Sequence, residues 1–507
     1  MPGLLIWIAG GIALAVLLGL IALWATGRYA KHKRGKPAFV LPVAGDSGLD
    51  TLLEPVQRAH PGQSGARLEP GESEALALRL ALAQLAERSL DLMYYIWDDD
   101  LTGRLMAQAV LEAADRGVRV RMLLDDVNAL NRDPVYRALD RHPRIEVRLF
   151  NPIRNRDRGF LRGLEILLNL LPYNRRMHGK MLIADHRLGV TGGRNIGDAY
   201  FGVLDDRGVN YDDLDILLAG AVLHDLGGLY DSFWNSALAL PIRTLWLGKT
   251  SRLRRFRARL AHRLSEALSQ RRAGALALPV VDDAVSVLRL DALRWSNDLS
   301  FVGDPPQKTL GGARDGWMPG ALLPVLQSAQ HSLRVMTPYF VPGTEGMAAL
   351  VALQRRGVQI EVITNSLALA DNVLVHGAYR WYRARLLAEG VRIVEVSATN
   401  SPRKMLHSKA FLVDDARGFV GSFNFDMRSA FLNTELGAVF EEPHLVADLQ
   451  AIFDAACAPD RAWRVTLRGR WPFWSRGSGG TAREPDSTAA RRMVSFVVGH
   501  LPIHRFL

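Results

Sequence analysis

Residues 178–195 read "HGKMLIADHRLGVTGGRN", and residues 407–424 read "HSKAFLVDDARGFVGSFN". The two stretches carry histidine, lysine, aspartate, glycine and asparagine at identical spacing. Each residue of the second set lies 229 positions beyond its counterpart, the difference between 407 and 178. A single copy could be a buried histidine beside a surface lysine, but the repetition argues against that interpretation. The pair of stretches therefore indicates an internal duplication.

The alternation of side chains along a β-strand sorts the repeated residues by face. His178 and Lys180 have the same parity and point to one face, whereas Asp185 has the opposite parity. The second copy repeats this pattern with His407, Lys409 and Asp414. We expect each histidine and lysine to converge on a ligand, and each aspartate to fix its strand from behind. The glycines that follow suit a tight turn, which would return Asn195 and Asn424 to the same neighbourhood as amide donors.

Two facing halves would place two imidazoles, two ammonium groups and two amides around one site, which fits a phosphodiester. One histidine can attack phosphorus, while the other protonates the leaving oxygen and then deprotonates the incoming hydroxyl. Because the lysines already supply positive charge, we expect neither a metal nor another cofactor. The positions predicted to bind substrate are Asn195, Asn424, Gly193 and Ser422.

A nucleophilic histidine needs its second ring nitrogen oriented, usually by a carboxylate. The candidates are Asp215 in "NYDDLDILLAG" (210–220) and Glu435 in "FLNTELGAVF" (431–440), one after each motif. Both adjoin leucine in an apolar strand, where an unpartnered carboxylate would be costly. The alternative is that each is a charge at the end of a strand, in contact with solvent.

The order of predicted elements also repeats along the chain. Strand patterns at 90–97 and 119–126 flank a helical pattern, and those at 333–340 and 359–366 flank another. Strand, helix and strand in this order imply a parallel pair with a crossover helix. We expect an α/β fold with two similar domains, each with a mixed sheet flanked by helices, related by a pseudo-two-fold axis.

The predicted boundaries follow from composition. We expect a transmembrane anchor at 1–27, a basic, Pro- and Gly-rich linker with little regular structure at 28–75 and a first domain at 76–250. A basic amphipathic connector at 251–300, a second domain at 301–460 and a loose segment with an apolar tail at 461–507 complete the chain. Cys457, the single cysteine, excludes an intramolecular disulfide and is expected in the core.

A net charge of +11 favours an anionic partner, either nucleic acid or an acidic lipid surface. Residues 1–27 contain no charged side chain or histidine, with Trp7 and Trp24 near the two ends. This is typical of an uncleaved anchor, and a cleaved signal peptide is the alternative. The basic residues that follow predict a cytoplasmic catalytic part.

Two further segments could contact lipid. Residues 154–171 join a basic cluster to an apolar run, and form either a lip for lipid tails or an insertion packed on the core. Residues 252–264 predict a basic amphipathic helix, which lies either on an anionic membrane or in solvent between the domains.

His178-x-Lys180-x4-Asp185 and His407-x-Lys409-x4-Asp414 resemble the paired HKD motifs of the phospholipase D superfamily. Flanking stretches such as "AADRGVRVRMLLDD" and "GGRNIGDAYF" are similar to the C-type branch of the bacterial cardiolipin synthases. The resemblance implies duplicated phospholipase D-like domains and ping-pong transfer of a phosphatidyl group to a hydroxyl of phosphatidylglycerol. It also implies His178 as nucleophile, His407 as acid and base, and a place in the bacterial inner membrane. The partners implied are phosphatidylglycerol, phosphatidylethanolamine as a second lipid, and an anionic membrane.

Three other functions compete with this one. A phospholipase D would use the same residues with water as acceptor. A nuclease of the same superfamily would suit the basic charge, but the apolar segments argue against it, so no nucleic-acid partner is expected. A non-catalytic lipid-binding scaffold would not need two complete motifs.

Overall fold

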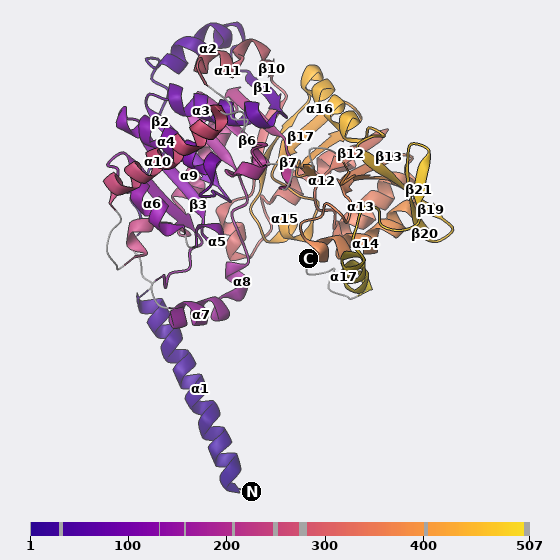
Figure 1. Cartoon of the computed structure of the whole chain (residues 1–507), viewed down its shortest axis with the longest axis horizontal. Coiled ribbons are helices and arrows are strands. Elements are labelled where there is room, and N and C mark those ends of the chain that lie inside the picture. The colour runs from indigo at the N-terminus through magenta and orange to yellow at the C-terminus, as the bar shows by residue number, and fades with distance from the viewer. Residues whose placement is uncertain are drawn as a thin grey trace.

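The computed structural model describes residues 2–29, 34–130, 132–156, 159–204, 208–246, 252–272, 281–399 and 404–500. Two α/β halves stand side by side, and the N-terminal helix projects from the first of them (Figure 1). Each half is built on one mixed β-sheet flanked by helices. The predicted fold class, with its duplicated domains, is therefore confirmed.

The first sheet has nine strands. Its central strands are almost fully buried because helices or the other half cover both faces, and their charged residues pair inside the protein, as Asp91 does with Arg121 at 2.6 Å. Three adjacent strands, β2 to β4, run parallel to one another, as the strand–helix–strand order predicts. In spatial order the strands are β10 (Arg294–Ser296), β1 (Ser64–Glu69), β8 (Asp215–Gly220), β6 (Leu188–Gly192), β5 (Met181–Ala184), β2 (Ser89–Tyr94), β3 (Arg119–Asp125), β4 (Ile145–Phe150) and β9 (Ala239–Pro241).

The second sheet has ten strands and repeats the arrangement of the first. The run from β11 to β19 matches the run from β1 to β9 strand by strand, including three parallel strands. In spatial order the strands are β11 (Leu299–Gly303), β18 (Leu436–Phe440), β17 (Arg417–Gly421), β16 (Ala410–Val413), β12 (Ser332–Met336), β13 (Gln359–Asn365), β14 (Arg392–Val396), β19 (Ala462–Arg468), β20 (Trp471–Arg476) and β21 (Gly479–Thr481).

Helices cover the outer faces of the sheets, and the inner faces meet in one shared apolar cluster, to which α9 (Leu223–Trp234) and α16 (Pro443–Ala456) also contribute. That cluster joins Leu218 and Tyr230 of the first half to Leu412 and Phe453 of the second. The helices of the first half are α2 (Gly48–Ala59), α3 (Glu72–Leu85), α4 (Leu101–Asp115), α5 (Asp126–Ala129), α6 (Asp133–Leu139), α7 (Gly159–Leu168), α8 (Leu170–Tyr173), α9 (Leu223–Trp234), α10 (Leu253–Arg272) and α11 (Ala284–Leu288). Those of the second are α12 (Met318–Gln327), α13 (Gly343–Arg355), α14 (Val373–Ala388), α15 (Met427–Phe431), α16 (Pro443–Ala456) and α17 (Ala489–His500).

The contacts between the halves are reciprocal. Strand β7 (Asn210–Asp212) pairs in parallel with β15 (Lys404–Leu406) across the interface. The amide of His178 donates to the carbonyl of Thr434 at 2.9 Å, and the amide of His407 donates to the carbonyl of Asp212 at 2.8 Å. Equivalent contacts made in both directions are the signature of a two-fold relation, here between two halves of one chain.

Two segments are more ordered than the sequence predicts. The expected linker contains α2, which Ser47 caps, and β1, whose six residues are all buried in the first sheet. The expected loose segment after residue 460 forms β19 to β21 at the edge of the second sheet. Cation–π contacts support that edge, because the guanidinium of Arg468 lies 3.4 Å from the ring centroid of Phe473.

The apolar face of the predicted helix at 252–264 is buried in the protein, so it faces neither a membrane nor solvent between the domains. Phe256, Leu260 and Leu264 of α10 are buried, and the helix packs against α4 and α6. Arg257 pairs with Asp115 of α4 at 2.6 Å. The helix is thus part of the first half, and both alternatives for residues 252–264 are wrong.

Helix α1 (Pro2–Tyr29) extends away from the body, and apolar side chains such as Trp7, Ile12 and Leu17 are exposed along it (Figure 1). Within the part of the chain that the structure describes, no helix meets the combined length and apolarity needed to cross a membrane. The Trp24 side chain, the predicted boundary at 250 and 251, and residues 501–507 of the predicted tail lie outside the described residues.

Candidate active site

The two motifs sit at equivalent places in the two sheets. His178 and Lys180 directly precede β5, and His407 and Lys409 directly precede β16. The lysines are buried completely or nearly so, with 0% and 1% exposure, whereas the histidines retain 9% and 8%. The site therefore opens to its surroundings at the imidazole rings, with the ammonium groups behind them.

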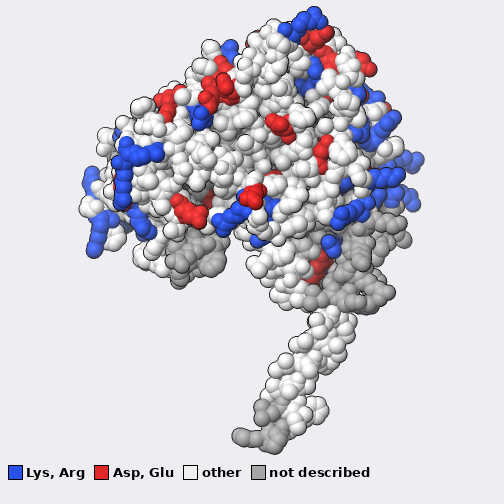
Figure 2. Space-filling view, turned by 180° about the vertical axis from the view of Figure 1, so that it is seen from behind, with Lys and Arg blue, Asp and Glu red and all other residues white. Residues whose placement is uncertain are grey.

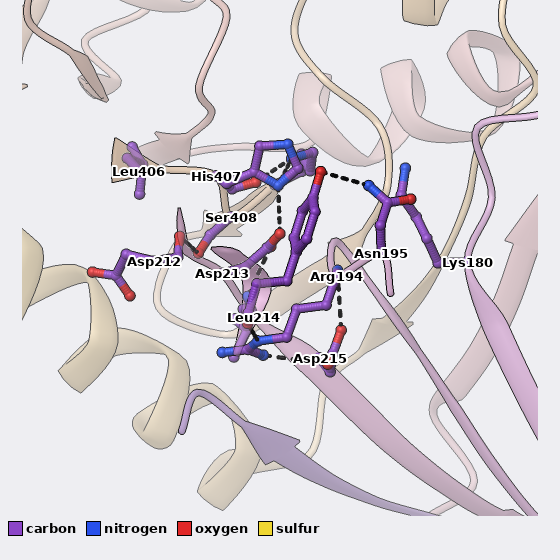
Figure 3. Close-up of polar contacts among 12 residues, drawn as sticks. Lys180, Arg194, Asn195, Asp212, Asp213, Leu214, Asp215, Leu406, His407 and Ser408 are labelled. Carbon is purple, nitrogen blue, oxygen red and sulfur yellow. Dashed lines mark hydrogen bonds and ion pairs between the residues drawn. The ribbon is translucent and has the colours of Figure 1, made fainter. Parts of the chain in front are cut away.

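Each histidine is held by a carboxylate from the other half. His178 Nδ1 lies 2.8 Å from Glu435 Oε2, and His407 Nδ1 lies 2.5 Å from Asp213 Oδ2. Figure 3 shows His407 of the second half directly over Asp213 of the first. Because Nδ1 of each ring faces a carboxylate, its N–H is directed there and Nε2 is left to face the site.

Asp215 does not have the predicted role. It pairs with Arg79 at 2.8 Å and with Arg194 at 3.3 Å, and Figure 3 shows it beside Arg194, away from His407. The reason is strand register: Gly192 faces Asp215 in the first sheet, and its counterpart Gly421 faces Gly437 in the second.

Asp213 is therefore the equivalent of Glu435, since each lies two residues before the residue that faces the glycine, which is Asp215 in the first half and Gly437 in the second. The sequence does carry this signal, because Asp213–Leu214 matches Glu435–Leu436. The matching acid–leucine pair distinguishes Asp213 from Asp212 and Asp215, which have no such counterpart.

Gly193 and Ser422 support these carboxylates and do not line the opening. A side chain at Gly193 would collide with Asp213, since its Cβ would lie 2.0 Å from Oδ1. Ser422, the counterpart of Gly193, donates to Glu435 Oε2 at 2.6 Å, and Ser429 donates to Oε1 at 2.8 Å. The shorter aspartate thus stands against glycine, whereas the longer glutamate is bound by two hydroxyls.

The motif aspartates lie behind the strands and bind backbone. Asp185 accepts hydrogen bonds from the amides of residues 87 to 89, and Asp414 accepts from those of residues 330 to 332, all at 2.7–2.9 Å. The tight turn falls at these aspartates and not at the later glycines, because Asp185 and His186 both have left-handed backbone, with φ of 51° and 58°. Asp414 and Asp415 repeat it.

The two motif asparagines differ. Asn195 is engaged at both ends, since Oδ1 accepts from the Ile96 amide at 3.0 Å and Nδ2 donates to the Tyr200 hydroxyl at 2.8 Å. Asn424 is also buried, but its Oδ1 has no hydrogen-bond partner. Asn424 is thus the motif amide with capacity left for a ligand.

Three tyrosines that the sequence did not single out surround the imidazoles. The ring of Tyr95 lies edge-on to His178 at 4.9 Å, while Tyr211 stacks on His407 at 5.0 Å and Tyr200 contacts it at 5.5 Å. These rings form apolar walls on both sides of the opening. No spacing in the sequence marks them, because they come from the residue directly after β2, from β7 and from the segment between β6 and β7.

Burial sets the charge state of the site. It lowers the pKa of Lys180 to about 7 and that of Lys409 to about 8, although Glu435 and Asp213 oppose the shift. Burial, then Lys409, lowers the pKa of His407 to about 4, and burial with Lys180 also lowers that of His178. Each lysine also acts on the histidine of the other half, so the four groups share one site.

The carboxylates respond in the opposite direction. Burial by itself would raise the pKa of Asp213, but Lys409 and His407 outweigh it and hold that pKa well below the ordinary value. His178 likewise outweighs the effect of burial and lowers the pKa of Glu435. Neutral imidazoles oriented by ionised carboxylates are the arrangement needed for nucleophilic and acid–base work.

One group of possible metal ligands occurs among the described residues, away from the motifs. Atoms of His376, Glu395 and Glu484 lie within 4.8 Å of one another. Arg383 already donates to Glu395 at 2.9 Å and to Glu484 at 2.5 Å, and Trp474 donates to Glu395 at 2.8 Å. The guanidinium occupies the position of positive charge that a metal would take.

A family profile described as "Cardiolipin synthase, PLD-like domain" matches residues 80–216 and 322–457, one match in each half. The chain is 36% identical over 437 residues to cardiolipin synthase C of Escherichia coli (strain K12), an alignment that covers 83% of this chain and 90% of that protein. It is 28% identical to cardiolipin synthase A of Salmonella arizonae, over 78% of this chain and 69% of that protein.

The fold is similar to a crystal structure of phosphatidylserine synthase from Haemophilus influenzae Rd KW20. The TM-score is 0.56 at 13% identity, with 80% of this chain and 90% of that chain covered. Two phospholipase D-like halves that share one histidine–lysine site define the class of protein. Within that class, the chain belongs to the cardiolipin synthase family.

Proposed function

We propose that this protein is a phosphatidyltransferase that makes cardiolipin by ping-pong transfer through a phosphohistidine, with phosphatidylglycerol as acceptor. The observation that carries the proposal is the crossed pairing of His178 with Glu435 and of His407 with Asp213. Two neutral imidazoles, each with its Nδ1 engaged, offer two Nε2 atoms to a single phosphate.

In the first step His178 Nε2 attacks phosphorus, and the bond from phosphorus to the head-group oxygen breaks. His407, protonated in the presence of the anionic phosphate, gives its proton to that oxygen, and the head-group alcohol leaves. Lys180 and Lys409 neutralise the charge that grows on the non-bridging oxygens. The Oδ1 atom of Asn424, which has no partner, accepts a hydrogen bond from a hydroxyl of the lipid head group.

In the second step neutral His407 takes a proton from a hydroxyl of phosphatidylglycerol. The oxygen attacks phosphorus, the phosphorus–nitrogen bond to His178 breaks, and cardiolipin forms. The tyrosine rings around the imidazoles limit the access of water, which would otherwise give phosphatidic acid.

The proposal includes attachment to the bacterial inner membrane. Residues 1–27, which lack charged side chains and histidine, would attach the protein to it, and the catalytic halves would face the cytoplasm. The exposed apolar side chains of α1 support this part of the proposal.

The test uses the purified protein in detergent with a chelator present and labelled phosphatidylglycerol, alone and with phosphatidylethanolamine. Cardiolipin as product supports the proposal, whereas phosphatidic acid as sole product identifies a phospholipase D. His178→Ala and His407→Ala should each reduce turnover at least about 10³-fold. His224→Ala, which alters an exposed histidine, is the matched control. Retained turnover in either catalytic variant would exclude the two-histidine mechanism.

A further inference from the structure

Helix α7 buries a charged residue and exposes an apolar side, the reverse of a helix on the surface of a water-soluble protein. Its buried side carries Glu165, which accepts hydrogen bonds from the amides of Arg154 and Asn155 at 2.9 and 2.8 Å and from the hydroxyl of Tyr173. Its outer side is apolar and continues into α8. The exposed residues of this side are Phe160, Leu167, Leu168, Leu170 and Leu171.

The polar anchor prevents the helix from rotating its leucines inward. Glu165 is 2% exposed, and turning it outward would break its hydrogen bonds inside the fold. Phe160 and Leu171 are nevertheless 84% and 80% exposed. A contiguous apolar surface fixed in this orientation indicates an apolar partner.

A second apolar surface lies on α17, in the other half. Ser495 of its inner side contacts His376 of α14 at 3.1 Å, and Val498 packs against Gly377. That docking fixes the helix with its opposite side outward. The exposed residues of that side are Met493, Val494, Phe496 and Val497.

These two surfaces lie on the side of the molecule from which α1 projects. Figure 1 shows α7, α8 and α17 along its lower edge, where α1 leaves the body, and α7 contacts α1. Three segments distant in sequence, each with exposed apolar side chains, thus lie at one edge of the molecule. A flat and extended apolar partner, such as a bilayer, can meet all three together.

Charge and position at α7–α8 also fit a bilayer. Arg154 and Arg175 line a cavity of about 600 Å³ at the foot of these helices, where an anionic head group would be neutralised. Lysine and arginine side chains are also numerous on both flanks of the molecule (Figure 2).

Helix α8 is linked to the active-site segment of the other half. Asn174, directly after α8, accepts a hydrogen bond from Arg428 at 2.8 Å, and Arg428 follows Asn424 by four residues.

We infer that α7–α8 and α17 form a two-point docking surface that inserts into an anionic bilayer and presses the opening of the active site against it. This inference rests on the proposed function for its purpose, since it explains how a two-tailed lipid reaches a buried histidine pair. The lipid would enter beside α8 without leaving the bilayer. The docking itself is a physical property that can be measured without any catalysis.

The experiment places a fluorophore on single introduced cysteines in the full-length chain, reconstituted in vesicles of phosphatidylglycerol and phosphatidylethanolamine with brominated acyl chains. The positions are Leu171→Cys and Val497→Cys, with Val285→Cys as control. Val285 is exposed on α11, which lies at the opposite side from α1 (Figure 1). Burial raises the pKa of the native Cys457 thiol to about 12, so labelling near neutral pH spares it.

Bromine should quench the probes at 171 and 497 at least about two-fold and leave the probe at 285 unchanged, because only acyl-chain depth brings bromine into contact. Quenching at only one of the two helices, or at neither, would overturn the two-point surface. The double variant Phe160→Asp and Leu171→Asp should lower the ratio of transfer rate in vesicles to that in micelles about ten-fold, and Val285→Asp should not.

The two proposals fail separately. Quenching without cardiolipin formation would leave the docking surface in place and refute the transferase. Cardiolipin formation with unquenched probes would support the transferase and refute the docking surface. An unchanged vesicle-to-micelle ratio in the double variant would contradict a role for α7–α8 in lipid entry.

Discussion

Asp213 and Asp215 differ by two positions in the chain and have separate tasks in the structure. Asp213 holds His407 of the other half, whereas Asp215 neutralises the buried guanidinium groups of Arg79 and Arg194. Both carboxylates are buried, so burial alone does not identify the one that serves the site.

Asp213→Asn should reduce kcat about 10³- to 10⁴-fold, because the amide disturbs the tautomer of His407, and should change the unfolding temperature little. Asp215→Asn should instead destabilise the fold by about 3–5 kcal/mol, because two buried arginines lose their counter-charge. Turnover per folded molecule and thermal unfolding of both variants are the measurements. If Asp213→Asn lost mainly stability and Asp215→Asn lost mainly turnover, the crossed pairing would be refuted.

The lysines should make the activity sensitive to alkali near neutral pH. Burial lowers their pKa values to about 7 and 8, so the ammonium groups are lost well below the ordinary lysine range. The value of kcat/KM should therefore fall as pH rises through about 7 to 8, since it reports the free enzyme. A profile that stays flat to pH 10 would show that these charges do not serve the reaction.

Residue types and spacing predicted the histidines, the lysines and the role of the motif aspartates, because strand parity and duplication act locally. Spacing alone did not separate Asp213 from Asp215; the matching acid–leucine pair marks Asp213, but its contact with His407 depends on how the two halves meet. Tyr95 and Tyr211 were missed for a related reason. Their position beside the imidazoles exists only after distant segments meet.

At the scale of elements, the turn after β5 joins that strand to the start of β2. The Asp185 carboxylate makes this connection by accepting hydrogen bonds from three backbone amides, and the Asp185 backbone is itself left-handed. Asp414 does the same after β16, in a more exposed position.

Asp185→Ala should destabilise the fold by about 2–3 kcal/mol, because buried amides lose their acceptor and alanine is strained at positive φ. Asp414→Ala should cost less, since water can reach its amides. Denaturant unfolding of both variants, with exposed Asp415→Asn as control, is the measurement. Equal stability of Asp185→Ala and the unaltered protein would show that the turn does not depend on this carboxylate.

Periodicity predicted the central strands and crossover helices, whose neighbours lie within one half. It did not predict the fate of α2, β1 or β19 to β21, because proline- and arginine-rich composition suggested loose chain. Burial of all six residues of β1 in the sheet offsets that local preference. The amphipathic pattern of α10 was recognised, but its partners α4 and α6 were not.

At the scale of the molecule, neither half contains a complete site. His178 and His407 each take their carboxylate from the other half, and the two inner sheet faces share one apolar cluster. The halves are joined between β10 and β11, at residues 297 and 298.

Chains 1–297 and 298–507 produced separately should therefore be inactive and prone to associate, and mixing them should restore transfer. The measurement is cardiolipin formation by each chain alone and by the mixture, with molecular size followed in parallel. A first half that is monomeric and active would contradict a site shared between halves.

In the proposed mechanism one phosphorus passes between two imidazoles and rests on one of them. The most direct test of this mechanism is rapid quenching of the enzyme during turnover of phosphorus-labelled phosphatidylglycerol, followed by mass analysis of the peptides that contain each motif. We expect a phosphatidyl adduct on His178, and none on the corresponding peptide of His178→Ala. Turnover without an adduct on either histidine would contradict it.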